Sequence, residues 1–99
     1  MAKTKTNQND TPSWIVEHDG FAVIELHRPA TFGGQKQTHV TMREPCVGDM
    51  KRVQNHKGGE ADKEIFAIAN LCEITPEEVE KLTLRNMSRV QAAFALFTD

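Results

Sequence analysis

The apolar residues of this chain change their spacing at Pro45. Before it, apolar and polar residues alternate over residues 21–26 and again over residues 39–43, which is the pattern of half-buried β-strands. An apolar run at residues 14–16 leads into a turn signal and predicts a strand that pairs with residues 21–26. The stretch over residues 28–35 contains a proline and two adjacent glycines and is predicted to be a loop.

After Pro45 the apolar residues recur three or four positions apart, as they do along one face of a helix. Helices are predicted over residues 50–54, over residues 60–72, over a short segment that begins at Pro76, and from about Arg85 onward. The predicted fold class is therefore α+β, with a small N-terminal antiparallel β-hairpin or sheet followed by three or four short α-helices.

The length of 99 residues is enough for one domain and too little for two. Residues 1–13 offer almost nothing to bury and are predicted to be a disordered lead-in, so the domain is expected over residues 14–99. No apolar run approaches the roughly 20 residues that span a bilayer, and the polar start does not resemble a signal peptide. We therefore expect a cytoplasmic protein without membrane contact.

Two local signals mark the starts of helices. Thr75, Pro76 and Glu78 form a capping box with proline at the first helical position: the threonine hydroxyl accepts from the Glu78 N–H, and the Glu78 carboxylate reaches back. Asp49 lies at the start of the helix after Pro45, where the helix dipole favours negative charge.

Charge is distributed unevenly around a net value of −2. Residues 27–59 carry a net charge of +4, whereas residues 60–82 hold seven acids against Lys63 and Lys81, for −5. Two solvated faces of opposite sign are the simplest interpretation, and a charged docking surface is the alternative.

The sequence predicts no catalytic residue, no cofactor and no metal site. The four histidines and two cysteines contain no pair at a spacing that prearranges zinc ligands. Cys46 and Cys72 are far apart and are expected to be reduced thiols, with Cys46 filling a corner between strand and helix. The glycine pairs lack the flanking residues of a phosphate-binding loop.

Two kinds of binding remain open for the last helix. As the recognition helix of a small DNA-binding regulator it offers few basic and amide side chains, and the helices before it are acidic and repel phosphate. Its apolar end favours a protein partner or self-association, with packing onto residues 65 and 68 as the alternative. The candidate partner-binding residues are Val90, Phe94, Leu96 and Phe97.

Residues 40–50, which read Val-Thr-Met-Arg-Glu-Pro-Cys-Val-Gly-Asp-Met, resemble the signature of the small tail assembly chaperones of Mu-like and related contractile-tailed bacteriophages. In that signature a hairpin leads through a corner with Arg43, Pro45 and Asp49 into a helix. Residues 65–82 resemble the family's apolar helix, small turn, Pro-Glu-Glu and leucine, and the end of the chain resembles its last helix.

Two residues depart from the family pattern: Cys46 replaces the usual threonine, and Asn86 stands where an aspartate is common. Both changes fall at the starts of helices, where they alter local capping.

The resemblance implies a non-enzymatic protein of the bacterial host's cytoplasm. Such a protein binds the tape measure protein, helps tail tube subunits assemble around it, and is absent from the mature virion. The tail tube protein is implied as a second partner. From the charge pattern, the acidic residues 60–82 are a candidate surface for steering the bound partner, the tape measure protein. A DNA-binding regulator and a self-assembling structural tail protein, acting as a homo-oligomer, are the alternatives.

Overall fold

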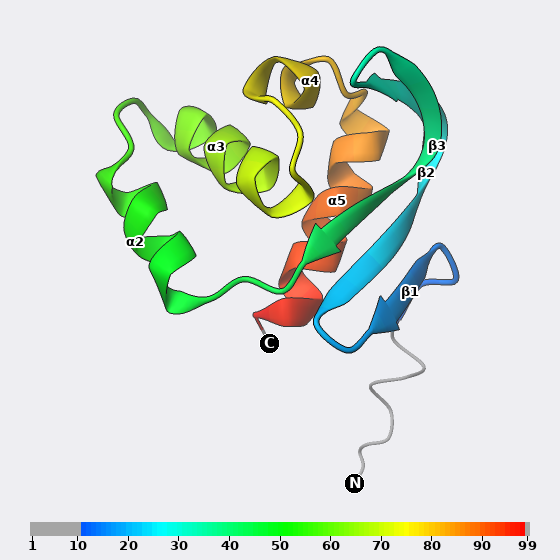
Figure 1. Cartoon of the computed structure of the whole chain (residues 1–99), viewed down its shortest axis with the longest axis horizontal. Coiled ribbons are helices and arrows are strands. Elements are labelled where there is room, and N and C mark those ends of the chain that lie inside the picture. Colours follow the sequence, from blue (N-terminus) through cyan, green and yellow to red (C-terminus); the bar gives the residue numbers. More distant parts are fainter. Residues whose placement is uncertain (1–10, 99) are drawn as a thin grey trace, which may run out of the picture.

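The computed structural model describes residues 11–98, in which three strands are followed by four helices (Figure 1). The strands are β1 Ile15–His18, β2 Phe21–Phe32 and β3 Gln35–Arg43, and the helices are α2 Val47–Asn55, α3 Glu60–Cys72, α4 Pro76–Glu80 and α5 Leu84–Phe97. The predicted α+β class is confirmed. Most of the predicted lead-in, residues 1–10, lies outside the described residues.

The strands form an antiparallel sheet in the order β1-β2-β3. One face of this sheet is apolar and buried, because alternate residues of each strand point to the same side. Helix α5 lies against β2 on that face, and α3 lies against β3 (Figure 1). The core fills the layer between sheet and helices. Its most buried side chains include Ala22, Ile24, Met42, Val90 and Ala93.

The predicted loop over residues 28–35 is wrong, because β2 continues to Phe32 and β3 begins at Gln35. Only Gly33 and Gly34 form the turn between them, and both have positive φ, of 60° and 80°. Positive φ at both central residues is what a tight type I′ hairpin turn requires. The predicted loop is therefore reduced to this two-residue turn, and the residues on either side of it belong to strands.

Pro29 lies inside β2 because the strand bulges there. Glu25 pairs with His39, whereas Ala30 pairs with Gln37, so the four intervening residues of β2 stand opposite one residue of β3. Such a bulge needs no regular ladder hydrogen bond from its residues and therefore tolerates proline. The bulge also leaves backbone N–H and C=O groups that need partners from elsewhere.

The helices agree with the predicted segments apart from their ends. Helix α2 begins at Val47, three residues before the predicted start at residue 50, and Asp49 lies in its first turn. Helix α4 begins at Pro76 as predicted, and α5 begins at Leu84, one residue early.

Candidate functional site

The corner between β3 and α2 is held by one buried carboxylate. Asp49 is 3% exposed and accepts hydrogen bonds of 2.8 Å from both terminal nitrogens of the Arg43 guanidinium. It also accepts the Arg52 Nη2 at 2.7 Å and the N–H of Cys46, which follows Pro45, at 2.8 Å. These donors, the Arg43 guanidinium first, hold the pKa of Asp49 well below its usual range. Arg43 and Asp49 of the motif thus meet in a joint between β3 and α2, and Pro45 directly precedes Cys46, whose N–H also contacts Asp49.

The predicted capping box of α4 is present and has an additional contact. Thr75 Oγ1 accepts the Glu78 N–H at 3.1 Å, and Glu78 Oε1 accepts the Thr75 N–H at 2.9 Å, with Pro76 in the first turn. Glu78 Oε2 accepts the N–H of Gly33 at 2.7 Å, which ties α4 to the β2-β3 turn. The N–H groups of Thr75 and Gly33 lower the pKa of Glu78.

A third joint connects α5 to the β2 bulge through Asn86, which is buried. Its Oδ1 accepts the N–H of His27 at 2.8 Å and that of Arg28 at 3.2 Å, and its Nδ2 donates to the Arg28 carbonyl at 2.9 Å. The side chain therefore satisfies backbone groups that the bulge removes from the ladder. Sequence reasoning missed this role, because Asn86 and its partners are 58 or 59 residues apart.

The basic residues of α5 are also engaged by the sheet. Arg89 Nη1 donates to the Glu25 carbonyl at 2.7 Å, and the Arg89 guanidinium lies 4.7 Å from the centroid of the Trp14 ring. Arg85 Nη1 lies 3.2 Å from Nε2 of His27. A DNA-recognition helix would need these side chains to face phosphates and bases.

The four predicted partner-binding residues lie in two environments. Val90 is 1% exposed and belongs to the core, so in this structure it has no surface to offer a partner. Phe94, Leu96 and Phe97 are half-buried, and they pack against the margin of the core while keeping exposed surface.

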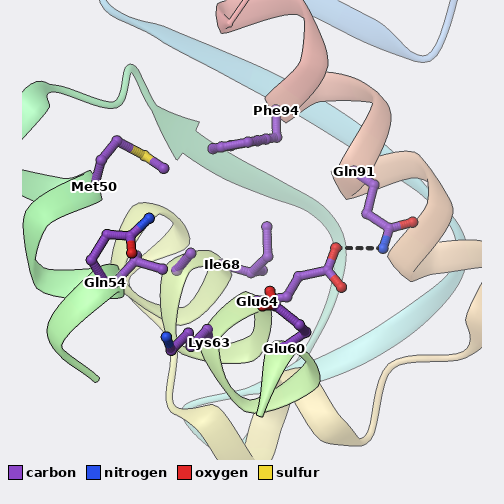
Figure 2. A pocket seen from close by; sticks show the side chains of 10 residues that line it. Met50, Gln54, Glu60, Lys63, Glu64, Ile68, Gln91 and Phe94 are labelled. Carbon is purple, nitrogen blue, oxygen red and sulfur yellow. Dashed lines mark hydrogen bonds between the residues drawn. The ribbon is translucent and has the colours of Figure 1, made fainter. Parts of the chain in front are cut away.

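A groove of about 490 Å³ opens beside Phe94, between α2, α3 and α5 (Figure 2). The ring of Phe94 points toward Met50 across the groove, and Ile68 lies between them at its floor. Met50 is 42% exposed. The other lining residues are Val53, Gln54, Glu60, Lys63, Glu64, Ala67 and Gln91. Periodicity alone did not reveal this groove, since its lining comes from three separate helices.

One side of the groove is acidic. Glu64 Oε2 accepts a hydrogen bond of 2.6 Å from Nε2 of Gln91, as Figure 2 shows. Among residues 11–98 the ion pairs within 4.0 Å all involve Asp49, so none of the acids of α3 and α4 has a cationic partner at that distance. Six of the seven acids in residues 60–82 are exposed, and the seventh, Glu78, accepts the backbone N–H groups of Thr75 and Gly33.

The described cysteines differ in exposure. Cys46 is exposed, whereas Cys72 is buried and burial raises the pKa of its thiol to about 12. Residues 11–98 contain no group of three or more histidine, cysteine, aspartate or glutamate side chains that could hold a metal ion. None of the helices in that same part of the chain is long and apolar enough for a membrane crossing. What the groove offers is apolar contact and negative charge.

Comparison with known proteins identifies the family. Residues 23–99 match the family described as "Phage tail assembly chaperone proteins, E, or 41 or 14". The match begins within β2 and includes the Asp49 joint, the α4 cap, Asn86 and the groove. No curated protein and no solved structure matches the chain. Since the family match covers well over half of the sequence, this chain belongs to the phage tail assembly chaperone family.

Proposed function

We propose that this chaperone binds the tape measure protein of its phage through the apolar side chains at the C-terminal end of α5. By holding that protein it promotes assembly of the tail tube, with the tail tube protein as a second partner, and it does not enter the mature virion. It works in the cytoplasm of the host cell and catalyses no reaction.

The observation that carries this proposal is the exposed apolar surface of Phe94, Leu96 and Phe97 in a chain of this family. Large apolar side chains that keep contact with water gain free energy when a partner covers them. The partner that the family resemblance implies, the tape measure protein, is a long helical chain that is prone to aggregate. An apolar helix end is suited to such a partner, because helices bind one another through apolar faces.

Co-expression with the tape measure protein of the same phage tests the proposal. We expect the two proteins to co-purify and the soluble fraction of the tape measure protein to rise. The double variant Phe94→Ser, Phe97→Ser should remain folded by circular dichroism and lose most of this capture. Leu84→Ser is the matched control, since Leu84 lies on the same helix, is 85% exposed, and is at the other end.

Three results would count against the proposal. The absence of both co-purification and a gain in solubility for the wild-type chain would reject capture of the tape measure protein. Salt-sensitive retention on duplex DNA would favour a regulator instead. A large oligomer in light scattering without any partner would favour a structural tail protein.

A further inference from the structure

We propose that the groove between α2, α3 and α5 binds one amphipathic helix of the partner, with the apolar face of that helix in the groove and its lysine or arginine side chains over Glu60 and Glu64. This inference rests on the proposed function, because the partner it assumes is the tape measure protein.

The composition of the groove favours a helix over an extended strand. Its surface is made of side chains from three helices, with Ile68 at the floor and Met50 and Phe94 on opposite walls (Figure 2). A strand would bind through main-chain hydrogen bonds to a free sheet edge, which this groove does not supply. Its volume of about 490 Å³ lies within the range of about 300–1,000 Å³ typical of sites that enclose a ligand. The side chains of one helical turn can enter such a space.

Met50 provides an adaptable wall for this helix. Its side chain is unbranched and 42% exposed, so it can move to fit different apolar side chains. Phe94 supplies the fixed wall opposite, since it also packs against the core. A groove with one adaptable and one fixed wall suits a partner that presents apolar residues of differing shape.

The negative charge beside the groove favours basic side chains next to the apolar face of the partner helix. Glu60 and Glu64 are four residues apart on α3 and therefore lie on the same face. Among residues 11–98, the Glu60 carboxylate makes no ion pair within 4.0 Å, and Glu64 is held only by the Gln91 amide. Lys63 lines the groove as well, which leaves the rim with one net negative charge. Lysine or arginine on the partner would pair with these carboxylates.

A second copy of this chain fits the groove less well. In a symmetric dimer the same patch meets itself, so the acidic face of α3 in one copy would approach that of the other. Glu60 and Glu64 of one copy would then lie near Glu60 and Glu64 of the other, and like charges at short range repel. Charge complementarity therefore favours a basic helix from a different protein.

Overlapping peptides that cover the tape measure protein of the same phage test this inference. Binding of each labelled peptide to the full chain is measured by fluorescence anisotropy, beside co-purification of the full-length tape measure protein. We expect the tightest peptides to be amphipathic helices with lysine or arginine beside their apolar face. We expect their affinity to fall as salt concentration rises.

Two matched pairs of variants locate the binding site. Met50→Glu should weaken peptide binding more than about tenfold, because the groove would then bury a charge. Val47→Glu, on the same helix at an 86% exposed position outside the groove, should change it less than twofold. Glu60→Lys should weaken binding about two- to fivefold, as expected for a partly exposed ion pair. Glu77→Lys makes the same charge change outside the groove and should have a smaller effect.

The outcomes separate the groove from the chaperone function. If the wild-type chain captures the tape measure protein and Met50→Glu behaves like Val47→Glu, the groove is wrong and the proposed function stands. If the wild-type chain captures neither protein nor peptide, both proposals fail. Equal effects of Glu60→Lys and Glu77→Lys would overturn the basic flank. A wild-type dimer that Met50→Glu dissociates would make a second copy the occupant and overturn the inference.

Discussion

The two ends of α5 are attached to the protein in opposite ways. At its first turns, Asn86 and Arg89 form side-chain hydrogen bonds with backbone groups of β2. At its last turns, Phe94 and Phe97 pack as half-buried apolar side chains, and the side-chain hydrogen bonds of Thr98 go only to the helix's own carbonyls. One end is held by directional polar contacts and the other by apolar contacts.

This difference shows how a small protein can keep a fixed fold beside a surface that takes a partner. Hydrogen bonds depend on angle as well as distance, so those at Asn86 set both the position and the rotation of α5 on the sheet. Apolar contact is non-directional, so water at the other end of α5 can be replaced by a partner's side chains without rebuilding the fold.

The largest loss in the free energy of unfolding is expected when the hydrogen bonds at the polar end of α5 are removed. Asn86→Ala leaves the N–H groups of His27 and Arg28 and the Arg28 carbonyl without their partner in a partly buried position. Each unsatisfied buried group costs about 1–3 kcal/mol, and since the strand can relax we expect a loss of about 3 kcal/mol in the free energy of unfolding. Urea denaturation followed by circular dichroism measures this loss.

Asn86→Asp is the control for that prediction. Aspartate keeps the two acceptor contacts and places a negative charge in the first turn of α5, but it cannot donate to the Arg28 carbonyl. We therefore expect a loss smaller than that of Asn86→Ala. A wild-type unfolding curve for Asn86→Ala would show that Asn86 does not anchor the helix.

The joint around Asp49 is a second set of polar contacts. Breaking it should lower the free energy of unfolding by less than Asn86→Ala does. Asp49→Asn removes the charge that Arg43 and Arg52 surround, but Arg43 is partly exposed and water can replace the lost contact. We expect a loss of about 2 kcal/mol at pH 7, below the roughly 3–5 kcal/mol of a fully buried pair.

The contacts of Asp49 should also make the free energy of unfolding depend on pH. The pKa of Asp49 in the folded protein is lowered, so its contribution to stability is fully present above the unfolded pKa of about 3.9 and is lost as pH falls below that value. Urea denaturation at pH 7, 5 and 3 should show the wild-type chain losing more stability between pH 5 and pH 3 than Asp49→Asn. Parallel losses in the two proteins would contradict this assignment.

The sequence predicted the contacts that are local and missed those that join distant segments. The capping box of Thr75 and Glu78 spans four consecutive residues, so its geometry follows from helix formation alone. The partners of Asn86 come from a bulge in β2 that contains Pro29, and proline there resembled a loop signal. Only pairing with β3 turns that segment into a strand, and no local pattern contains that information.

In the candidate site, too, local features were predicted from the sequence, whereas features that join distant segments were not. Helical spacing correctly placed Val90 and Phe94 on one apolar side of α5, but it could not tell which of them faces the core. That depends on how the helix is rotated against β2, which Asn86 helps to fix. The groove requires Met50 of α2 to lie opposite Phe94 of α5, a distance of 44 positions in the sequence.

The smallest losses in the free energy of unfolding are expected for the side chains of α5 that contact water. They test whether the C-terminal end of α5 contributes less to stability than the end held by Asn86. Phe97→Ser removes a half-buried ring and should cost about 1 kcal/mol, less than the roughly 3–5 kcal/mol of a core phenylalanine. Leu84→Ser, at an 85% exposed position, should stay within about 0.5 kcal/mol of the wild-type chain. Urea denaturation of these two variants and of Asn86→Ala ranks the three losses in the free energy of unfolding. If Phe97→Ser costs as much as Asn86→Ala, the C-terminal end of α5 is core, and the surface assigned to the partner must lie elsewhere.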